Sequence, residues 1–248
     1  MSGLTYLTKV QKSTLRKIIG ILVLCIFPLF LSTAFADDPI KVTISHTFDD
    51  VIFDGEWSFS HEWKASALDQ FRFAGNDLVL RTAHQDNHMY VLIDVLGDLT
   101  NDRMADRAVV CFDGKETSEI ADESDWCYVA TRGSKNGHTL NGGSPSNPSS
   151  HFKIQKNHPD FIAIGGTSGE HDRYLKIPHA AYEFKIPLEQ IGFENEYGFF
   201  MQVFDKDDVM TYPNEHSGKY PQKIPSPKKW GLMISPDNSI LSEHFNQN

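Results

Sequence analysis

The chain has 248 residues, 40% of them hydrophobic and 12% aromatic, and its 33 acidic and 23 basic side chains give a formal net charge of −10. This hydrophobic content suffices for a packed core and excludes a largely disordered chain. The negative charge argues against a nucleic-acid partner, because an acidic surface repels phosphate and the sequence contains no basic stripe.

The first 36 residues have the parts of a secretory signal peptide. Basic residues precede an uncharged stretch at 18–31, and the cleavage site Ala34-Phe35-Ala36 follows it. The 14 residues of the stretch, rising about 1.5 Å each, span roughly 21 Å, less than the roughly 30 Å of a bilayer core. We therefore expect a secreted protein of residues 37–248 with a net charge of −14, since four basic residues and no acidic one are removed. An uncleaved stretch would instead act as a membrane anchor. The basic residues are Lys9, Lys12, Arg16 and Lys17.

Short apolar or alternating runs, separated by turn residues, make up most of the remaining chain. The run 88–95 is apolar on both faces apart from Asp94, which predicts a central strand, and the alternating run 182–187 predicts a half-buried antiparallel strand. One helical turn is predicted at 188–191. About ten strands predict an all-β fold, a jelly-roll-like antiparallel β-sandwich in a single domain. The predicted strands are 41–48, 57–63, 78–83, 88–95, 107–113, 126–132, 161–164, 182–187, 198–205 and 229–234.

Two further features concern loops and cysteines. In 133–150, 14 of 18 residues are Gly, Ser, Asn or Pro, which predicts a flexible loop of the kind that carries binding residues at sandwich rims.

Cys111 and Cys127 are the two cysteines outside the signal peptide, and an even pair in an exported chain predicts a disulfide worth about 3 kcal/mol. The alternative is two buried thiols in neighbouring strands. No CxxC or CxxCH motif supports a zinc module or covalent haem.

Several short motifs follow one another in a fixed order between roughly residues 45 and 235. This order resembles the family 9 carbohydrate-binding modules and the wider DOMON-like group. The resemblance implies a galactose-binding-like antiparallel sandwich that binds a sugar, or haem b in related branches, and is not usually catalytic. It also implies structural calcium. The motifs are Asp54-Gly55-Glu56-Trp57, Tyr90-Val91-Leu92-Ile93-Asp94, Asp106 to Asp113, Glu183-Phe184-Lys185-Ile186-Pro187-Leu188 and Gly198 to Asp205.

A sugar site needs flat rings that stack on pyranoses and polar groups that reach their hydroxyls. Trp57 and Trp63 lie in the motif that packs such a sandwich, so we expect both in the core. Two other tryptophans follow acidic or proline-rich segments typical of a rim. The sequence therefore predicts a ligand site at the sandwich rim, formed by Trp126, Trp230, Asp125 and Arg132.

Three kinds of metal or cofactor site are open from the sequence. Clustered carboxylates at Asp49, Asp54 and Asp205 could hold calcium, although solvated loop carboxylates are the plainer interpretation. His84 and His88 flank a predicted hairpin turn and could form half of a copper or zinc site. Haem b is a further alternative, with a methionine ligand such as Met104.

No G-x-S-x-G, S-x-x-K or H-E-x-x-H motif occurs, and we do not expect an enzyme. The sequence predicts an exported, non-catalytic binding module for an oligo- or polysaccharide, such as a cell-envelope glycan, or a module that accompanies a separate hydrolase. The alternatives are a redox or carrier domain with haem b or a histidine-bound metal, and an extracellular structural domain without a small ligand.

Overall fold

The computed structural model describes residues 38–44, 51–73, 75–114, 119–143 and 152–235. The chain divides into two compact units, Met1–Ala36 and Asp37–Asn248. The predicted signal peptide, Asp49 and residues 144–150 of the predicted loop 133–150 lie outside the described residues, and His138–Asn141 of that loop form a strand instead. Among those residues, no helix is both long enough and apolar enough to cross a bilayer.

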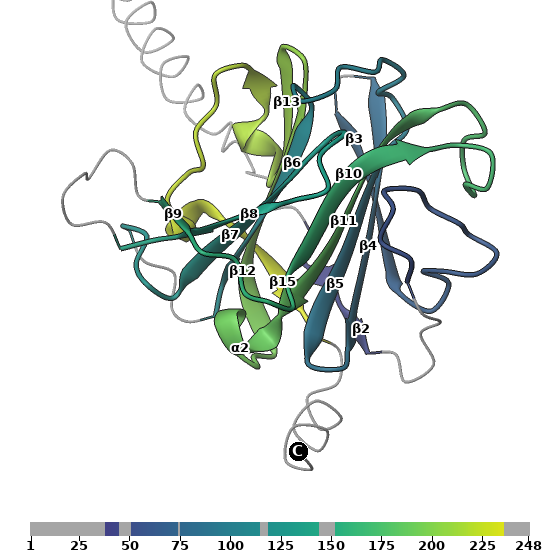
Figure 1. The fold of residues 1–248 in the computed structure, drawn as a ribbon. Coiled ribbons are helices and arrows are strands. Elements are labelled where there is room, and N and C mark those ends of the chain that lie inside the picture. The colour runs from purple at the N-terminus through teal and green to yellow at the C-terminus, as the bar shows by residue number, and fades with distance from the viewer. Residues whose placement is uncertain (1–37, 45–50, 74, 115–118, 144–151, 236–248) are drawn as a thin grey trace, which may run out of the picture. The chain divides into compact units, whose positions relative to one another are not determined.

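Two stacked β-sheets form the described part of the second unit (Figure 1). The larger sheet has the order β1 (Ile40–Lys41), β15 (Gly231–Ile234), β12 (Glu196–Asp205), β6 (Arg107–Asp113), β7 (Asp125–Thr131), β8 (His138–Asn141) and β9 (Lys153–Gln155), with β13 (Asp208–Tyr212) on β12 and β14 (Gly218–Lys219) on β13. The smaller sheet has the order β10 (Ile162–Ser168), β11 (His179–Pro187), β5 (His88–Val95), β4 (Asn76–Gln85) and β2 (Thr43–Ile44), with β3 (Ala67–Phe73) also on β4. The short helices are α2 (Leu188–Ile191), η1 (Asn214–His216) and η2 (Pro227–Lys229).

All strand pairs are antiparallel except two short ones, β1 with β15 and β2 with β4. The prediction of an all-β antiparallel sandwich is therefore confirmed, as is the helical turn at 188–191. The structure has more strands than the ten expected, because short pairings such as β8, β9 and β14 contain too few residues to show an alternating pattern.

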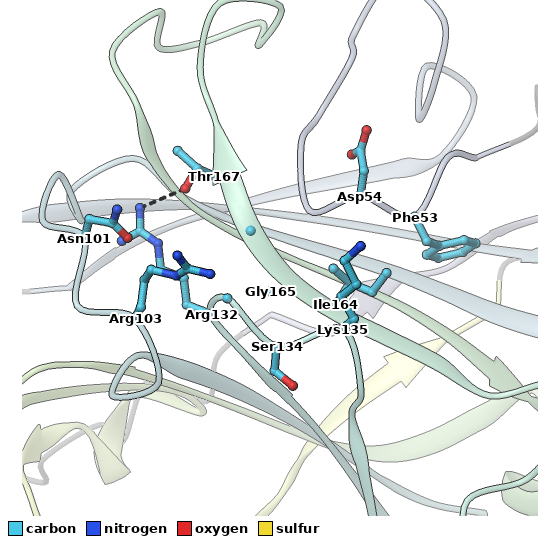
Figure 2. A pocket seen from close by; sticks show the side chains of 12 residues that line it. Phe53, Asp54, Asn101, Arg103, Arg132, Ser134, Lys135, Ile164, Gly165 and Thr167 are labelled. Carbon is cyan, nitrogen blue, oxygen red and sulfur yellow. Dashed lines mark hydrogen bonds between the residues drawn. The ribbon is translucent and has the colours of Figure 1, made fainter.

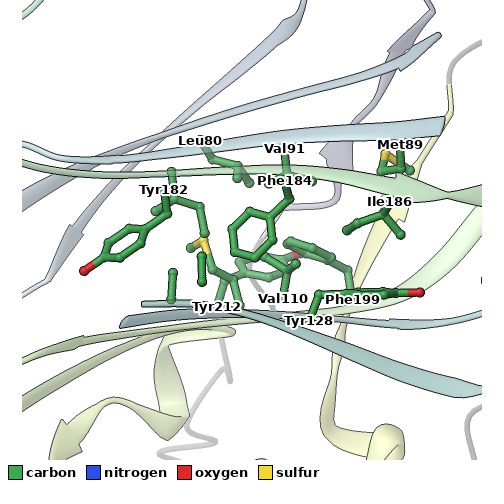
Figure 3. Packing of buried hydrophobic residues seen from close by; sticks show 14 of the residues in the cluster. Leu80, Met89, Val91, Val110, Tyr128, Tyr182, Phe184, Ile186, Phe199 and Tyr212 are labelled. Atoms are coloured by element: carbon green, nitrogen blue, oxygen red, sulfur yellow. The ribbon is translucent and has the colours of Figure 1, made fainter. Parts of the chain in front are cut away.

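The main core fills the space between the two sheets (Figure 3). On β11, the alternating side chains Tyr182, Phe184 and Ile186 point from the smaller sheet toward the larger one, where Tyr128 and Phe199 meet them. Successive side chains of a strand point to opposite faces, so every second residue of β11 enters this core. The alternation read from the sequence thus identifies the core face of this strand.

Each sheet is also covered on its outer face, which explains why its strands are apolar on both sides. The segment 51–66, which we call the covering segment, packs Trp57 and Trp63 onto the smaller sheet with no exposed surface on either side chain. On the larger sheet, Trp230 stacks between Phe152 and Phe200, with ring centroids 6.2 Å apart in both pairs.

The strand predicted at 57–63 is wrong, because these residues form turns of the covering segment. Its tryptophans are held by packing against the outer face of the sheet, and backbone pairing plays no part. The predicted hairpin between β4 and β5 has a two-residue turn at Asp86 and Asn87. Their φ angles of 49° and 61° are typical of a type I′ turn, whose twist matches that of the flanking strands.

Cys111 and Cys127 form a disulfide, so the prediction of a bridge is confirmed. The two residues lie directly opposite each other on β6 and β7, and both belong to the apolar cluster beneath Trp230. The bridge therefore joins the two central strands of the larger sheet on its outer face.

Candidate functional site

A concave site, which we call the rim pocket, opens where the ends of several segments meet beside β10 (Figure 2). Its volume is about 520 Å³, within the roughly 300–1,000 Å³ typical of small-ligand sites. Its floor comes from β10, one wall from the covering segment, and the opposite wall from the loop after β5 and the residues after β7. The lining residues are Phe53, Asp54, Asn101, Arg103, Arg132, Gly133, Ser134, Lys135, Ile164, Gly165, Gly166 and Thr167.

Adjacent glycines in β10 allow both walls to approach the floor. A Cβ atom on Gly166 would lie 2.7 Å from the Cα of Gly55, and one on Gly165 would lie 2.7 Å from the backbone nitrogen of Arg132. Both distances are shorter than a Cβ atom tolerates, so any side chain at either position would push a wall away. The Gly-Gly pair therefore makes the shape of the pocket possible.

A buried carboxylate fastens the wall formed by the covering segment. The Oε2 atom of Glu183 accepts hydrogen bonds from the backbone N–H groups of Gly55 at 2.8 Å and Asp54 at 3.1 Å. Its Oε1 atom accepts a third from the indole N–H of Trp63 at 3.1 Å. Since Glu183 belongs to β11 and has no exposed surface, this wall is tied directly to the smaller sheet.

Backbone hydrogen bonds fasten the opposite wall. The N–H of Gly133 donates to the carbonyl of Gly165 at 2.8 Å, and the N–H of Met104 donates to the carbonyl of Arg132 at 3.0 Å. The side chain of Arg103 lies against Gly133, where a Cβ atom would be 2.7 Å from its Nε atom. The loop after β5 is thus held onto the end of β7, and this places Arg103 at the pocket.

Arg132 connects the pocket to a buried acidic cluster. Its guanidinium donates to the carbonyl of Thr100 and, at 3.3 Å, to the hydroxyl of Thr167 on the pocket floor. Its Nη1 atom also lies 3.6 Å from Asp98 and 3.5 Å from Asp106, and all three charged side chains are almost fully buried. Arg132 therefore lines the pocket, and the buried carboxylates of Asp98 and Asp106 balance its positive charge.

The acidic cluster consists of Asp98, Asp106 and Asp205, whose nearest carboxylate oxygens lie within 4.8 Å of one another. Burial raises the pKa of each carboxyl above its usual range, and repulsion between the three raises it further. Burial raises the pKa of the Tyr182 hydroxyl, and the negative charges of these carboxylates raise it further. This hydroxyl has no hydrogen-bond partner among the described residues. One guanidinium faces three carboxylates, so the cluster has a surplus of buried negative charge.

A second buried network lies on the outer face of the smaller sheet, beneath the covering segment. The Nε2 atom of His179 lies 2.8 Å from Asp94 and 3.7 Å from Asp172, and its Nδ1 atom lies 2.6 Å from the carbonyl of Ile177. Burial alone lowers the pKa of His179, but its bonds to the two carboxylates outweigh that effect and raise the pKa to about 10. None of the three charged side chains has exposed surface, and the network joins β5, β11 and the segment between β10 and β11.

The predicted ligand residues do not form one site. Arg132 lines the rim pocket, while Trp126 and Asp125 lie six and seven residues away at the other end of β7, roughly 20 Å distant at about 3.3 Å per residue. Trp126 packs against the main core and Trp230 is 7% exposed, with its indole N–H donating to the carbonyl of Pro225 at 3.1 Å. Burial raises the pKa of Asp125 to about 7.

The predicted metal residues are also separated. Asp54 is exposed on the wall of the rim pocket opposite Arg132, whereas Asp205 belongs to the acidic cluster behind it (Figure 2). His84 points into the main core, where its ring meets Tyr197. His88 points to the outer face, so the two histidines lie on opposite sides of the smaller sheet. Met104 is exposed in the loop after β5.

Sequence reasoning missed Phe53, Arg103 and Thr167 as pocket residues. A signal was present in the Gly165-Gly166 pair, because two glycines inside a strand often mark a close approach of another backbone. Which segments make that approach depends on contacts between residues far apart in the sequence.

No protein-family model and no curated protein matches the sequence. Two solved structures that resemble this chain are a family 9 carbohydrate-binding module from Caldicellulosiruptor kristjanssonii in complex with cellotriose and one in complex with glucose. The first is 16% identical in sequence and has a TM-score of 0.45, and the match covers 80% of this chain and 93% of the chain in that structure. The second is 14% identical, with coverages of 79% and 95% and the same TM-score. Both are members of the family that the motif order resembles.

Proposed function

We propose that this chain is an exported, non-catalytic carbohydrate-binding module whose sugar lies in the rim pocket. The observation that carries the proposal is the pocket itself, which combines an aromatic side chain with converging hydrogen-bond donors and acceptors. Phe53 is half-buried, stacked on Tyr90 with a centroid distance of 6.0 Å, and supplies the apolar surface. Asn101, Ser134 and Thr167 add polar side chains to the lining of the pocket (Figure 2).

Export is supported by two features of the chain. The disulfide between Cys111 and Cys127 is typical of proteins that fold in an oxidising compartment. The sequence of the first 36 residues has the organisation of a signal peptide. We therefore propose that the module acts outside the cytoplasm, on a glycan of the cell envelope or the surroundings.

The sugar proposal is tested with a glycan array followed by calorimetric titration of the exported protein. We expect binding to one family of glycans, and we expect Asn101→Ala to weaken it about fivefold because one hydrogen bond is lost. Asn195→Ala is the matched control, since Asn195 is an exposed asparagine outside the pocket. A blank array, or equal affinities for the two variants, would contradict the assignment of sugar binding to this pocket.

We further propose that the acidic cluster holds a calcium ion. Calcium prefers carboxylate oxygens, and the Oδ2 atoms of Asp98 and Asp106 accept no hydrogen bond among the described residues, although each forms an ion pair with Arg132. Asp102 adds a fourth negative charge nearby, as its effect on the pKa of Asp106 and of Asp205 indicates. Such an ion would offset the surplus of buried negative charge beside Arg132.

Removal of calcium is expected to lower the free energy of unfolding by about 3 kcal/mol, relative to protein in calcium at roughly one hundred times its Kd. Asp106→Asn should abolish this response, because it removes one charge from the cluster. Asp160→Asn should retain it, since Asp160 is an exposed aspartate outside the cluster. Thermal unfolding in calcium and in chelator measures the effect. Identical melting curves of the unchanged protein in the two solutions would refute the calcium site.

A further inference from the structure

The charge of the rim pocket differs from that of the chain as a whole. The chain has ten more acidic than basic side chains, yet three basic side chains line the pocket and Asp54 is the single acidic one. The three are Arg103, Arg132 and Lys135. A basic hollow in an acidic protein attracts negatively charged ligands over neutral ones.

The basic side chains differ in how far their charge is already balanced. Arg132 is balanced by the buried carboxylates of Asp98 and Asp106. Arg103 and Lys135 are exposed, and neither makes an ion pair or a side-chain hydrogen bond within the part of the chain that the structure describes. Two positive charges are therefore available to a ligand.

Arg103 is exceptional among the arginines of the described residues. Every other arginine there contacts a carboxylate, a carbonyl oxygen or an aromatic ring through its guanidinium. These contacts are Arg72 with Asp77, Arg81 with Ser66 and Trp57, Arg107 with Phe204, Arg132 with Asp106, and Arg173 with Phe59 and Tyr174. Arg103 instead lies against Gly133 beside Arg132, which leaves its planar donor array to an incoming group (Figure 2).

The two walls of the pocket differ in charge. Arg103 and Arg132 lie on one wall, while Asp54 and Phe53 lie on the other (Figure 2). A carboxylate would be attracted to the first wall and repelled by Asp54, which can instead accept hydrogen bonds from hydroxyl groups. A ligand with a carboxylate at one end and hydroxyls at the other therefore matches both walls.

We propose that the rim pocket recognises an acidic saccharide, in which the carboxylate of a uronic acid unit is held by the guanidinium of Arg103 on the arginine wall. This inference rests on the proposed carbohydrate-binding function and narrows its ligand class. The hydroxyl edge of the same sugar faces Asp54, and its apolar face contacts Phe53.

The test is calorimetric titration of the exported protein with an oligogalacturonate and with a neutral galactose oligomer of the same length. We expect the acidic oligomer to bind at least about tenfold more tightly, with the difference shrinking at high ionic strength. Arg103→Gln should lower the affinity for the acidic oligomer about tenfold, a larger loss than for the neutral oligomer, which has no carboxylate to pair with the guanidinium. Lys41→Gln is the control, because it removes the same charge at an exposed position on β1, outside the pocket.

Each result has a separate meaning. Equal affinity for the acidic and the neutral oligomer would overturn this inference and leave the proposed function intact, whereas binding of neither would overturn both. Displacement by acetate at an equal concentration would overturn recognition of a saccharide, since the carboxylate alone would then carry the affinity. Equal binding of a sulfated galactose oligomer would overturn the assignment to a carboxylate.

Discussion

His179→Ala is expected to lower the free energy of unfolding by about 3–5 kcal/mol, because it leaves Asp94 and Asp172 buried and close together without their cationic partner. Both ring nitrogens of His179 face acceptors, so the protonated form of the imidazole is favoured. Urea denaturation of the two proteins measures the difference. His171→Ala should change stability by less than about 0.5 kcal/mol, because His171 is exposed.

This contribution has a defined dependence on pH. The pKa of His179 in the folded protein is about 10, above its value of 6.5 in an unfolded chain. The stabilisation is therefore complete below about pH 6.5 and is lost as the pH rises through about 10. A loss of stability in His179→Ala that is no larger than in His171→Ala would contradict the buried ion pair.

His84→Leu is expected to raise the free energy of unfolding by about 1–3 kcal/mol near neutral pH. The ring of His84 is 2% exposed, and neither of its nitrogens has a hydrogen-bond partner among the described residues. Leucine has a similar size and no polar atom to leave unpaired, so it suits the neighbouring apolar side chains better. Urea denaturation again measures the change, with His171→Ala as the control.

The advantage of His84→Leu should grow in acid. Burial lowers the pKa of His84 from 6.5 to about 4. Between these two pH values the imidazole is protonated in the unfolded chain and neutral in the folded protein. The unchanged protein therefore loses about 3 kcal/mol from this group as the pH falls from about 6.5 through about 4, and the variant does not. Buried carboxyls such as Asp94 and Glu183 titrate in both proteins, so the difference between the two isolates His84. A difference that stays constant with pH would refute the buried neutral histidine.

The strand predicted from alternation, 182–187, has the main core on one face and the covering segment on the other, so the expectation that it is half-buried is wrong and Glu183 on the second face is fully buried. Tyr182, Phe184 and Ile186 enter the core on every second position, and this pattern can be read directly from the sequence. The segment containing Trp57 and Trp63 is equally rich in aromatic residues, but it lies flat on an outer sheet face that the sequence does not indicate. Aromatic content alone therefore could not separate a strand from a covering segment.

The site was predictable only in part. Arg132 follows a well-predicted strand, and its position at the rim follows from the end of that strand. Trp126 and Trp230 were chosen because they flank polar segments, yet side-chain packing buries both to a large extent. His84 and His88 are four residues apart, but the two-residue turn between β4 and β5 puts them on opposite faces. The face on which each of these side chains lies depends on the pairing register of the strands, which cannot be read from a single sequence.

The contacts around β10 divide the rim pocket into a constant part and a variable part. Gly55, Gly165 and Gly166 meet at distances that admit no side chain, so these positions must be retained for the walls to stay in place. Asn101 and Lys135 project from loops and support none of the described hydrogen bonds with their side chains. Substitutions at such projecting positions could therefore change which glycan is preferred without loss of folding. The same scaffold is thus well suited to diversification, by evolution or by a selection experiment that randomises only the projecting residues.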